Sequence, residues 1–305
     1  MAQRWAAIDI GTNSVRLLIC KKENGRIKGE KKVCITRLGE GLSKEKHLTQ
    51  EAMQRTEQAV LQFAKEAIGA GAEAPVWCYA TSAARQADNG LAFLQRLTDS
   101  GLVRAELLSG EEEAQAAYLG SQAKGRPVLD VGGGSTELTI QKGACLNGQS
   151  IPLGCVTLKE QYMKTDRMEA EQKQALRAFC KSRSLALTEK VLCGQRAETL
   201  IAVGGTATQL SMLTLGLPAY DANRVHGFQL TKEQVETWYD TLTALSGAER
   251  RALPGMEAKR ADVIVCGTAI IAAVMENCGA GMIQVSDKDG LDGYLQRKME
   301  MALDK

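Results

Sequence analysis

Two short stretches of the sequence repeat one pattern, in which an apolar strand ends in an aspartate, runs into a glycine-containing turn and returns as a second strand. Residues 8–17 read IDIGTNSVRL, and residues 129–138 read LDVGGGSTEL. In this alignment Asp9 corresponds to Asp130, and the serine that closes each turn is also shared. A single turn of this kind is usually a tight hairpin and nothing more. Two copies, separated in the sequence by about the length of one domain, indicate that both turns serve the same function.

Turns of this type suit the binding of phosphate groups. Glycine allows positive φ and carries no side chain, so successive main-chain N–H groups can converge on an anion. An aspartate beside such a turn is expected where Mg²⁺ bridges carboxylate and phosphate oxygens. The pattern therefore predicts a phosphate site, with a divalent ion, between two parts of the chain. Its candidate phosphate-binding residues are Gly11, Thr12, Asn13, Ser14, Gly132, Gly133, Gly134 and Ser135, and its candidate metal ligands are Asp9 and Asp130.

Hydrolysis of a phosphate anhydride also needs a group that positions or deprotonates water. The sequence has only two histidines, so a carboxylate is the expected base. Glu111, Glu112 and Glu113 begin a predicted helix in which they point in different directions, so at most one of them faces a cleft. Helix capping and compensation of the helix dipole are the alternative roles for these acids. Glu137, after the second turn, is either a surface residue of a strand or a further metal ligand.

Composition narrows the class of protein. A chain of 305 residues is long enough for two domains. Its net charge of +2 and its 4% of aromatic residues argue against a nucleic-acid-binding protein. Nine cysteines without a C-x-x-C pair suit a reducing compartment. No signal peptide is evident, and the apolar run 263–275 is shorter than the roughly 20 residues that span a bilayer. We therefore expect a cytoplasmic protein without a membrane or nucleic-acid partner.

Hydrophobic periodicity and turn residues predict alternating strands and helices. The expected strands are 5–10, 15–20, a third strand after a solvated charged hairpin at 21–32, 75–82, two strands around the turn within 128–140, 145–153, the start of 200–213, and MIQVSD near the end. The expected helices are 50–68, one that begins after Ser109, 166–184, the second part of 200–213, one that begins after Thr231, 258–278, and one from about residue 289. A change of segment is expected near residue 125.

Several stretches, taken together and in order, resemble the exopolyphosphatase/guanosine pentaphosphate phosphohydrolase (Ppx/GppA) family of the actin-like, sugar kinase and Hsp70 superfamily. They are AIDIGTNSVRLLI, ATSAARQADN, LSGEEEAQAAYLG, LDVGGGSTEL, PLGCVTLKEQY, AVGGTATQL, VHGFQLT, ADVIVCGTAII and VSDKDGLDGYL. The resemblance implies an α/β fold of two ribonuclease H-like (actin-like ATPase) lobes, each a mixed five-stranded sheet flanked by helices, with a cleft between them. The expected lobes are residues 1–124 and 125–305, and a C-terminal helix at about 296–305 is expected to pack back on the first lobe.

The resemblance also implies roles for individual residues. It makes Glu113 the catalytic base, places Arg85 beside the phosphates, and associates Asp130, Glu137 and Asp9 with Mg²⁺, for which Mn²⁺ is the alternative. Gly204, Gly205 and Thr206 resemble the nucleotide-binding turn of the superfamily, and tight packing of a strand on a helix is their alternative role.

The implied reaction is release of terminal orthophosphate from inorganic polyphosphate, that is, an exopolyphosphatase. The alternatives are a guanosine pentaphosphate 5′-phosphohydrolase, a kinase, and a non-catalytic nucleotide- or polyphosphate-binding protein. Many members of the family continue into a helical HD-type domain, and this sequence is expected to be the short two-domain form. A homodimer is also compatible with the family.

Overall fold

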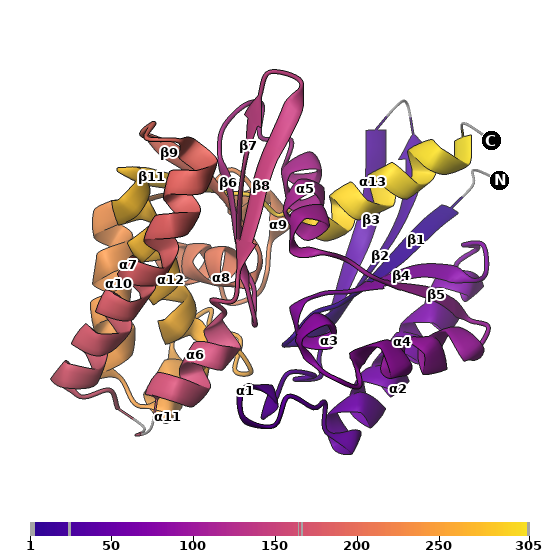
Figure 1. Cartoon of the computed structure of the whole chain (residues 1–305), viewed down its shortest axis with the longest axis horizontal. Helices are drawn as coiled ribbons and strands as arrows, with labels where there is room; N and C mark the ends of the chain where they lie inside the picture. The colour runs from indigo at the N-terminus through magenta and orange to yellow at the C-terminus, as the bar shows by residue number, and fades with distance from the viewer. Residues whose placement is uncertain (1–3, 24–25, 164, 166, 304–305) are drawn as a thin grey trace.

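Two β-sheets lie side by side in the computed structural model, which describes residues 4–23, 26–163, 165 and 167–303 (Figure 1). The first sheet consists of β1 (Arg4–Ile10), β2 (Ser14–Glu23), β3 (Arg26–Ile35), β4 (Val76–Ala80) and β5 (Val103–Leu107). Its strand order is β3-β2-β1-β4-β5, with the first three strands antiparallel and β4 and β5 parallel to β1. This is the predicted five-stranded mixed sheet. The tip of the charged hairpin, residues 24–25, lies outside the described residues.

The second sheet repeats this arrangement and adds one strand. It consists of β6 (Val128–Val131), β7 (Thr136–Lys142), β8 (Cys145–Ile151), β9 (Thr199–Val203), β10 (Gln229–Thr231) and β11 (Met282–Val285). Its order, β10-β11-β9-β6-β7-β8, contains the first sheet's order and places β10 antiparallel to β11 at the edge. The prediction of five strands was therefore wrong for this sheet, because a three-residue strand is too short to show an alternating pattern.

Helices cover both sheets. Around the first sheet are α1 (Leu42–Glu45), α2 (Gln50–Gly69), α3 (Ser82–Gln86), α4 (Gly90–Asp99) and α5 (Gly110–Ser121). Later in the chain are α6 (Cys155–Tyr162), α7 (Ala170–Leu192), α8 (Gly205–Leu215), α9 (Ala222–Val225), α10 (Lys232–Ala244), α11 (Gly247–Ala252), α12 (Ile264–Cys278) and α13 (Gly290–Leu303). The helix expected at 258–278 begins only at Ile264, because turns occupy the residues before it. The helix expected at 166–184 lies at Ala170–Leu192 instead.

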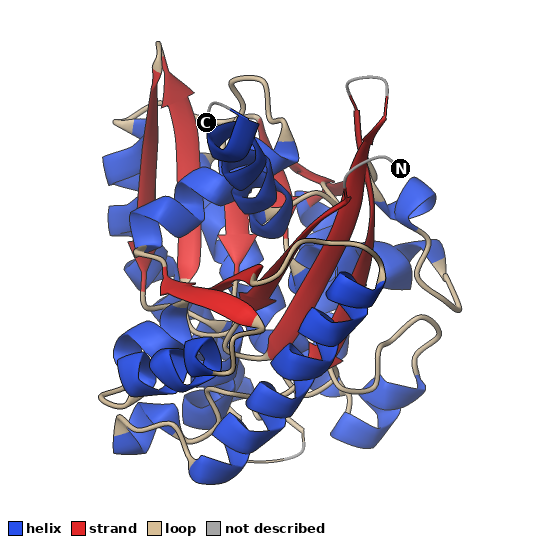
Figure 2. Ribbon diagram, turned by 90° about the vertical axis from the view of Figure 1, so that its right-hand side faces the viewer, coloured by secondary structure: helices blue, strands red, loops and turns tan. Residues whose placement is uncertain are grey.

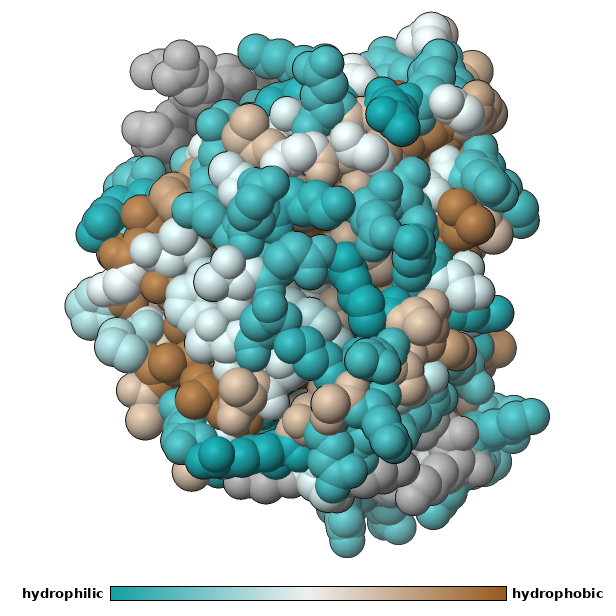
Figure 3. Space-filling view, turned by 90° about the vertical axis from the view of Figure 1, so that its left-hand side faces the viewer, coloured by the Kyte–Doolittle hydropathy of each residue, from teal (hydrophilic) through white to brown (hydrophobic). Residues whose placement is uncertain are grey.

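The apolar run 263–275 forms most of α12, which is buried in the core of the second sheet. In the described part of the chain, no helix is both long enough and apolar enough to cross a membrane. The outer face over the second sheet is mostly hydrophilic, with only small separated apolar patches (Figure 3). Burial of α12 by its neighbours therefore explains its apolar composition.

The first sheet is packed on both faces (Figure 2). Successive residues of a strand point to opposite faces. Along β1, Ile8 and Ile10 share a buried cluster with residues of α2 and α4, whereas Trp5 and Ala7 share another with Leu295 of α13. The C-terminal helix thus packs against the first sheet after the chain has completed the second.

Helices α5 and α13 cross in close main-chain contact, and they carry the chain between the two sheets in opposite directions. The contact depends on glycine. A Cβ on Gly120 would overlap the carbonyl oxygen of Asp289, and one on Gly293 would overlap that of Ala116. Because the chain crosses between the sheets twice, the lobe boundary between residues 124 and 125 stays a prediction.

Substitution of either crossing glycine should destabilise the protein. In Gly120→Ala or Gly293→Ala the new methyl group meets a main-chain carbonyl that cannot rotate away, which should cost about 1–3 kcal/mol of unfolding free energy. Gly69→Ala is the matched control, because nothing lies within 4 Å of the added methyl group at this helical position. Urea denaturation would compare the three variants. Equal midpoints for Gly120→Ala and Gly69→Ala would contradict the proposed close crossing.

Candidate active site between the two glycine turns

The two repeated turns have the same main-chain geometry. The Gly11 amide donates to the Ser14 carbonyl over 2.9 Å, and the Gly132 amide donates to the Ser135 carbonyl over 3.0 Å. Each turn joins the first two strands of its sheet, β1 to β2 and β6 to β7. The repeat in the sequence therefore corresponds to a repeat in the fold.

The carbonyl groups of each turn accept hydrogen bonds from main-chain amides of a segment that comes later in the chain. In the first turn, the Thr12 carbonyl accepts from the Gly39 amide and the Asn13 carbonyl accepts from the Arg37 amide, both over 2.9 Å. In the second, the N-terminus of α6 does the same, since the Val156 amide donates to the Gly133 carbonyl over 2.8 Å. The main-chain dipoles of both turns are thereby oriented with their N–H groups away from these supports.

The N–H groups at the tips of the turns remain without acceptors. Among the described residues, the amides of Thr12, Asn13, Gly133 and Gly134 donate no hydrogen bond. The turns also face each other closely, since a Cβ on Gly133 would lie 2.9 Å from the Thr12 Cβ. Free amides on both sides of a narrow gap are donors for an anion.

A cavity of about 110 Å³ lies between the turns and brings together most of the predicted site residues. Its lining includes Asp9, Gly11, Thr12, Asn13, Ser14, Glu113, Asp130, Gly132, Gly133, Gly134, Ser135, Gly204, Gly205 and Thr206. Gly204 lies beside the acid of the second turn, since a Cβ on it would be 2.7 Å from Asp130 Oδ1. Arg85 and Glu137 do not line the cavity, and both lie behind it.

The start of α5 selects one of three consecutive glutamates for the cavity. Ser109 caps the helix and exchanges hydrogen bonds with Glu112, which is thereby occupied. Glu111 is exposed. Only Glu113 lines the cavity, as the helical spacing requires.

Arg85 holds Glu113 in place. Both terminal nitrogens of Arg85 lie 3.3 Å from Glu113 Oε2, and one of them also donates to the Leu108 carbonyl over 2.7 Å. On the other side, Glu137 Oε1 accepts a hydrogen bond from the Ser150 hydroxyl over 2.6 Å, while Oε2 is buried and has no partner. Glu137 is thus a second buried carboxyl group behind Glu113.

Burial raises the pKa values of these carboxyl groups, and the charge of Glu137 adds to the shift at Glu113 and Asp130. Desolvation and the charge of Glu137 raise the pKa of Glu113 well above its usual range, against the opposing effect of Arg85. Desolvation and Glu137 also raise the pKa of Asp130 to about 8. Desolvation raises the pKa of Glu137 to about 6, although hydrogen bonds from Ser150 and Ser135 oppose the shift. All three pKa values are therefore raised, although Arg85 lowers those of Glu113 and Glu137 and Arg16 lowers that of Asp130.

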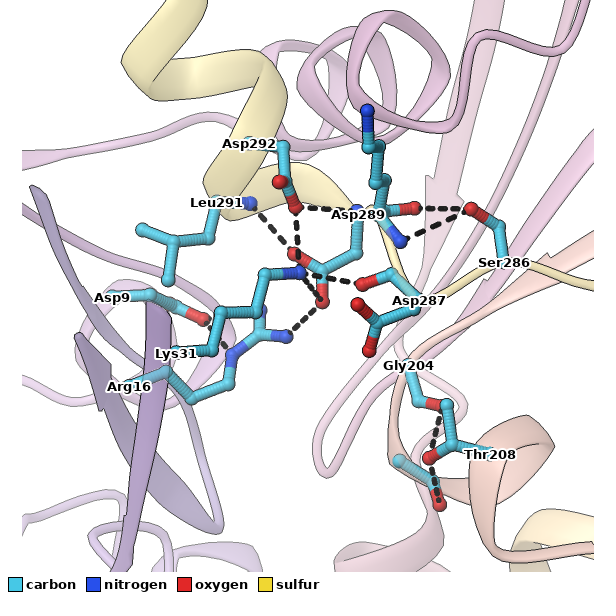
Figure 4. Close-up of polar contacts among 12 residues, drawn as sticks. Asp9, Arg16, Lys31, Gly204, Thr208, Ser286, Asp287, Asp289, Leu291 and Asp292 are labelled. Atoms are coloured by element: carbon cyan, nitrogen blue, oxygen red, sulfur yellow. Dashed lines mark hydrogen bonds and ion pairs between the residues drawn. The ribbon is translucent and has the colours of Figure 1, made fainter. Parts of the chain in front are cut away.

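Arg16 was missed by the sequence reasoning. It binds Asp9, with Nε 2.7 Å from Oδ2, and its Nη1 lies 2.5 Å from Asp289 Oδ2 (Figure 4). Lys31 joins the same network through Asp289 and Asp292. A signal for Arg16 was present, because Asp9 and Arg16 are cross-strand partners in the first hairpin.

The donor set fits a divalent cation only in part. Asp9 keeps one buried oxygen, Oδ1, without a partner, and the Asp130 carboxylate makes no hydrogen bond or ion pair with any described residue. Yet no group of three or more His, Cys, Asp or Glu residues within that part of the chain is placed to hold a metal by itself. This suits Mg²⁺, which binds through one or two carboxylates and completes its shell with water and phosphate oxygens.

The support behind the second turn can be tested by Gly154→Ala. Its methyl group would overlap the Gly133 carbonyl and displace the turn, so inorganic phosphate should bind at least tenfold more weakly in isothermal titration calorimetry. Gly281→Ala, where the added methyl group meets nothing within 4 Å, is the control. Unchanged phosphate affinity in a folded Gly154→Ala variant would show that the turn does not bind the anion.

Comparison with known proteins identifies the family. The sequence profile of the Ppx/GppA phosphatase family matches residues 18–300. Exopolyphosphatase 2 of Mycobacterium tuberculosis is 32% identical, over 95% of this chain and 97% of its own. The guanosine-5′-triphosphate,3′-diphosphate pyrophosphatase of Photobacterium profundum is 30% identical over 90% of this chain, which spans only 54% of that relative. A crystal structure of the Aquifex aeolicus family member superimposes with a TM-score of 0.82 and 29% identity over 99% of both chains. The chain therefore belongs to the Ppx/GppA phosphatase family and is a phosphatase.

Proposed function

We propose that the protein is an Mg²⁺-dependent exopolyphosphatase, which releases terminal orthophosphate from inorganic polyphosphate. The observation that carries this proposal is the position of Glu113, a carboxylate that lines a cavity walled on two sides by glycine turns with free amides. A similar protein that spans nearly the same length bears the name exopolyphosphatase. A phosphate-binding cavity with an internal carboxylate suits attack by water.

Each group of residues has a separate task in the proposed reaction. The amides of Thr12, Asn13, Gly133 and Gly134 bind the oxygens of the terminal phosphoryl group and stabilise the charge that develops on them. Glu113 accepts the proton of the attacking water. Arg85 orients Glu113 and keeps its pKa from rising further. The shortened chain is the leaving group.

Metal dependence is general among Ppx/GppA phosphatases. We propose that Asp9 and Asp130 hold the ion, with Mg²⁺ preferred and Mn²⁺ as the alternative. A bound divalent ion supplies charge neutralisation at phosphate oxygens. Glu137, which lies behind the cavity, would act on the ion only through its neighbours. We propose that the protein acts in the cytoplasm, because the free cysteines among the described residues suit a reducing compartment. The homodimer stays a prediction.

Guanosine pentaphosphate is the second candidate substrate, and one observation favours it. A pocket of about 450 Å³ adjoins the cavity and shares Arg16, Gly204, Gly205 and Arg260 with it. Its wall includes apolar side chains and charged side chains of both signs, namely Val33, Met212, Pro218, Met256, Arg16, Lys31, Arg260, Glu257, Asp287 and Asp289. The apolar part of this wall suits a nucleobase, and its cations suit the phosphate groups that a nucleotide carries. Orthophosphate release from long polyphosphate and from guanosine pentaphosphate, each with and without Mg²⁺, would rank the two substrates.

Replacement of Glu113 should separate binding from hydrolysis. In Glu113→Gln the side chain keeps its shape but cannot accept the proton of water, so phosphate release from polyphosphate should fall about 10²–10⁴-fold while polyphosphate binding is retained. Glu111→Gln is the matched control, because this exposed residue starts the same helix. Malachite-green detection of orthophosphate would measure both variants. Activity of Glu113→Gln within tenfold of the unsubstituted protein would remove Glu113 as the base.

Replacement of Arg85 should move the pH dependence of the reaction. The base works when deprotonated, so activity falls as the pH drops through the pKa of Glu113. Arg85→Gln removes a charge that lowers this pKa, and the acidic limb of the kcat/KM profile should therefore move to higher pH. Arg85→Lys, which keeps the charge, should move it less. An acidic limb that stays in place in Arg85→Gln would contradict the pairing of Arg85 with the base.

A further inference from the structure

Ser82 lies at the point where the two halves of the site meet, and no role has been assigned to it so far. It is the first residue of α3, its exposed fraction is 2%, and it lines the cavity. Its hydroxyl faces the second glycine turn, since a Cβ on Gly134 would lie 2.7 Å from Ser82 Oγ and 2.8 Å from Thr12 Oγ1. Two hydroxyl groups from the first half of the chain thus face one glycine of the second half.

The polarity of the Ser82 hydroxyl is set by its neighbour Gln86. Gln86 Nε2 donates a hydrogen bond to Ser82 Oγ over 2.5 Å. A serine hydroxyl has one hydrogen and two lone pairs. Since Gln86 occupies a lone pair, the hydrogen of Ser82 remains free to donate, and it has no acceptor among the described residues. A buried donor without an acceptor is unfavourable unless a ligand supplies one.

Thr12 provides an independent observation in the same place. Its exposed fraction is 3%, and its Oγ1 is buried without any hydrogen-bond partner in the described chain. The free main-chain amides of Gly133 and Gly134 lie on the opposite side of the cavity. All of these groups are donors, and they surround a space that an acceptor-rich group such as a phosphoryl group would fill.

We propose that Ser82 is a further substrate-binding residue, whose hydroxyl donates a hydrogen bond to an oxygen of the phosphoryl group between the turns. Gln86 is a positioning residue, which acts by holding the Ser82 hydroxyl in the donating orientation. This inference rests on the proposed function, because it names the same phosphoryl group as the ligand. It adds a contact from the start of α3, outside both glycine turns.

The first test compares Ser82→Ala with Thr56→Ala. Thr56 is also fully buried, but its hydroxyl donates to the Ala52 carbonyl within α2, away from the cavity. Loss of a hydrogen bond to a charged oxygen should weaken binding of inorganic phosphate about 10–100-fold in Ser82→Ala, with a similar loss in kcat/KM for polyphosphate. Thr56→Ala should lose stability and keep its phosphate affinity. Unchanged phosphate affinity in a folded Ser82→Ala variant would overturn the proposal.

The second test reverses the hydrogen bond between Gln86 and Ser82. In Gln86→Glu the new carboxylate accepts the Ser82 hydrogen, so the serine can no longer donate to phosphate and affinity should fall nearly as far as in Ser82→Ala. The double variant Ser82→Ala/Gln86→Glu separates this effect from charge repulsion. If the carboxylate acts through Ser82, it should add less than a threefold loss to Ser82→Ala. If Gln86→Glu weakens phosphate binding as much in the Ser82→Ala background as it does alone, the carboxylate acts by charge repulsion. That result would overturn the role of Gln86.

These measurements separate failure of the inference from failure of the proposed function. Phosphate binding by the unsubstituted protein is measured without turnover, so it reports on the cavity alone. Hydrolysis of polyphosphate by the unsubstituted protein tests the proposed function independently. Active protein with normal phosphate binding in Ser82→Ala would overturn only the inference. Absence of polyphosphate hydrolysis, together with weak phosphate binding in Ser82→Ala, would overturn only the choice of substrate.

Discussion

The main physical constraint on the site is the burial of several carboxyl groups beside a cavity that is also lined by free main-chain amides. Burial and the charge of Glu137 raise the pKa values of Glu113 and Asp130, and Arg85 offsets only part of this effect at Glu113. A phosphate chain would add further negative charge to the same cavity. Arg16 and Arg260 line the cavity, and positive charge that entered with an anion would further offset the repulsion. The free amides supply partial positive charge at the turns, and a divalent cation at Asp130 would supply the rest.

The two hairpins have the same main-chain shape but opposite charge across their strands. Asp9 is paired with Arg16, whereas Asp130, its counterpart, is paired with Glu137. The first aspartate is therefore largely neutralised by its own hairpin and is further tied to Asp289 through Arg16. The second has no such partner. The same hairpin thus occurs twice, once with its aspartate in an ion pair and once with its aspartate beside another acid. Because of this difference, we expect the cation at Asp130.

Local patterns in the sequence predicted those features of the fold and the site that depend on residues close together in the chain. The acid-tipped turns and helix α2 follow from glycine and periodicity, and helical spacing limits the three glutamates of α5 to one that faces the cavity, whereas the choice of Glu113 came from the family resemblance. The edge strand β10 was missed because three residues carry no pattern, and its pairing with β11 is a tertiary contact. Arg16 and Ser82 were missed for a related reason. Arg16 has a local partner in Asp9, but its link to Asp289 and the approach of Ser82 to Gly134 join residues that lie far apart in the sequence.

The position of Glu113 depends on the packing of α5 against α13 beside the cavity. Glu113 lies in the first turn of α5, and the same helix meets α13 near its other end, where Gly120 touches the main chain of Asp289. Asp289 in turn binds Arg16, the partner of Asp9. One rigid helix and one ion-pair network thus connect the glutamate to the first turn through the C-terminal segment. The close glycine contact between α5 and α13 therefore supports the geometry of the site as well as the fold.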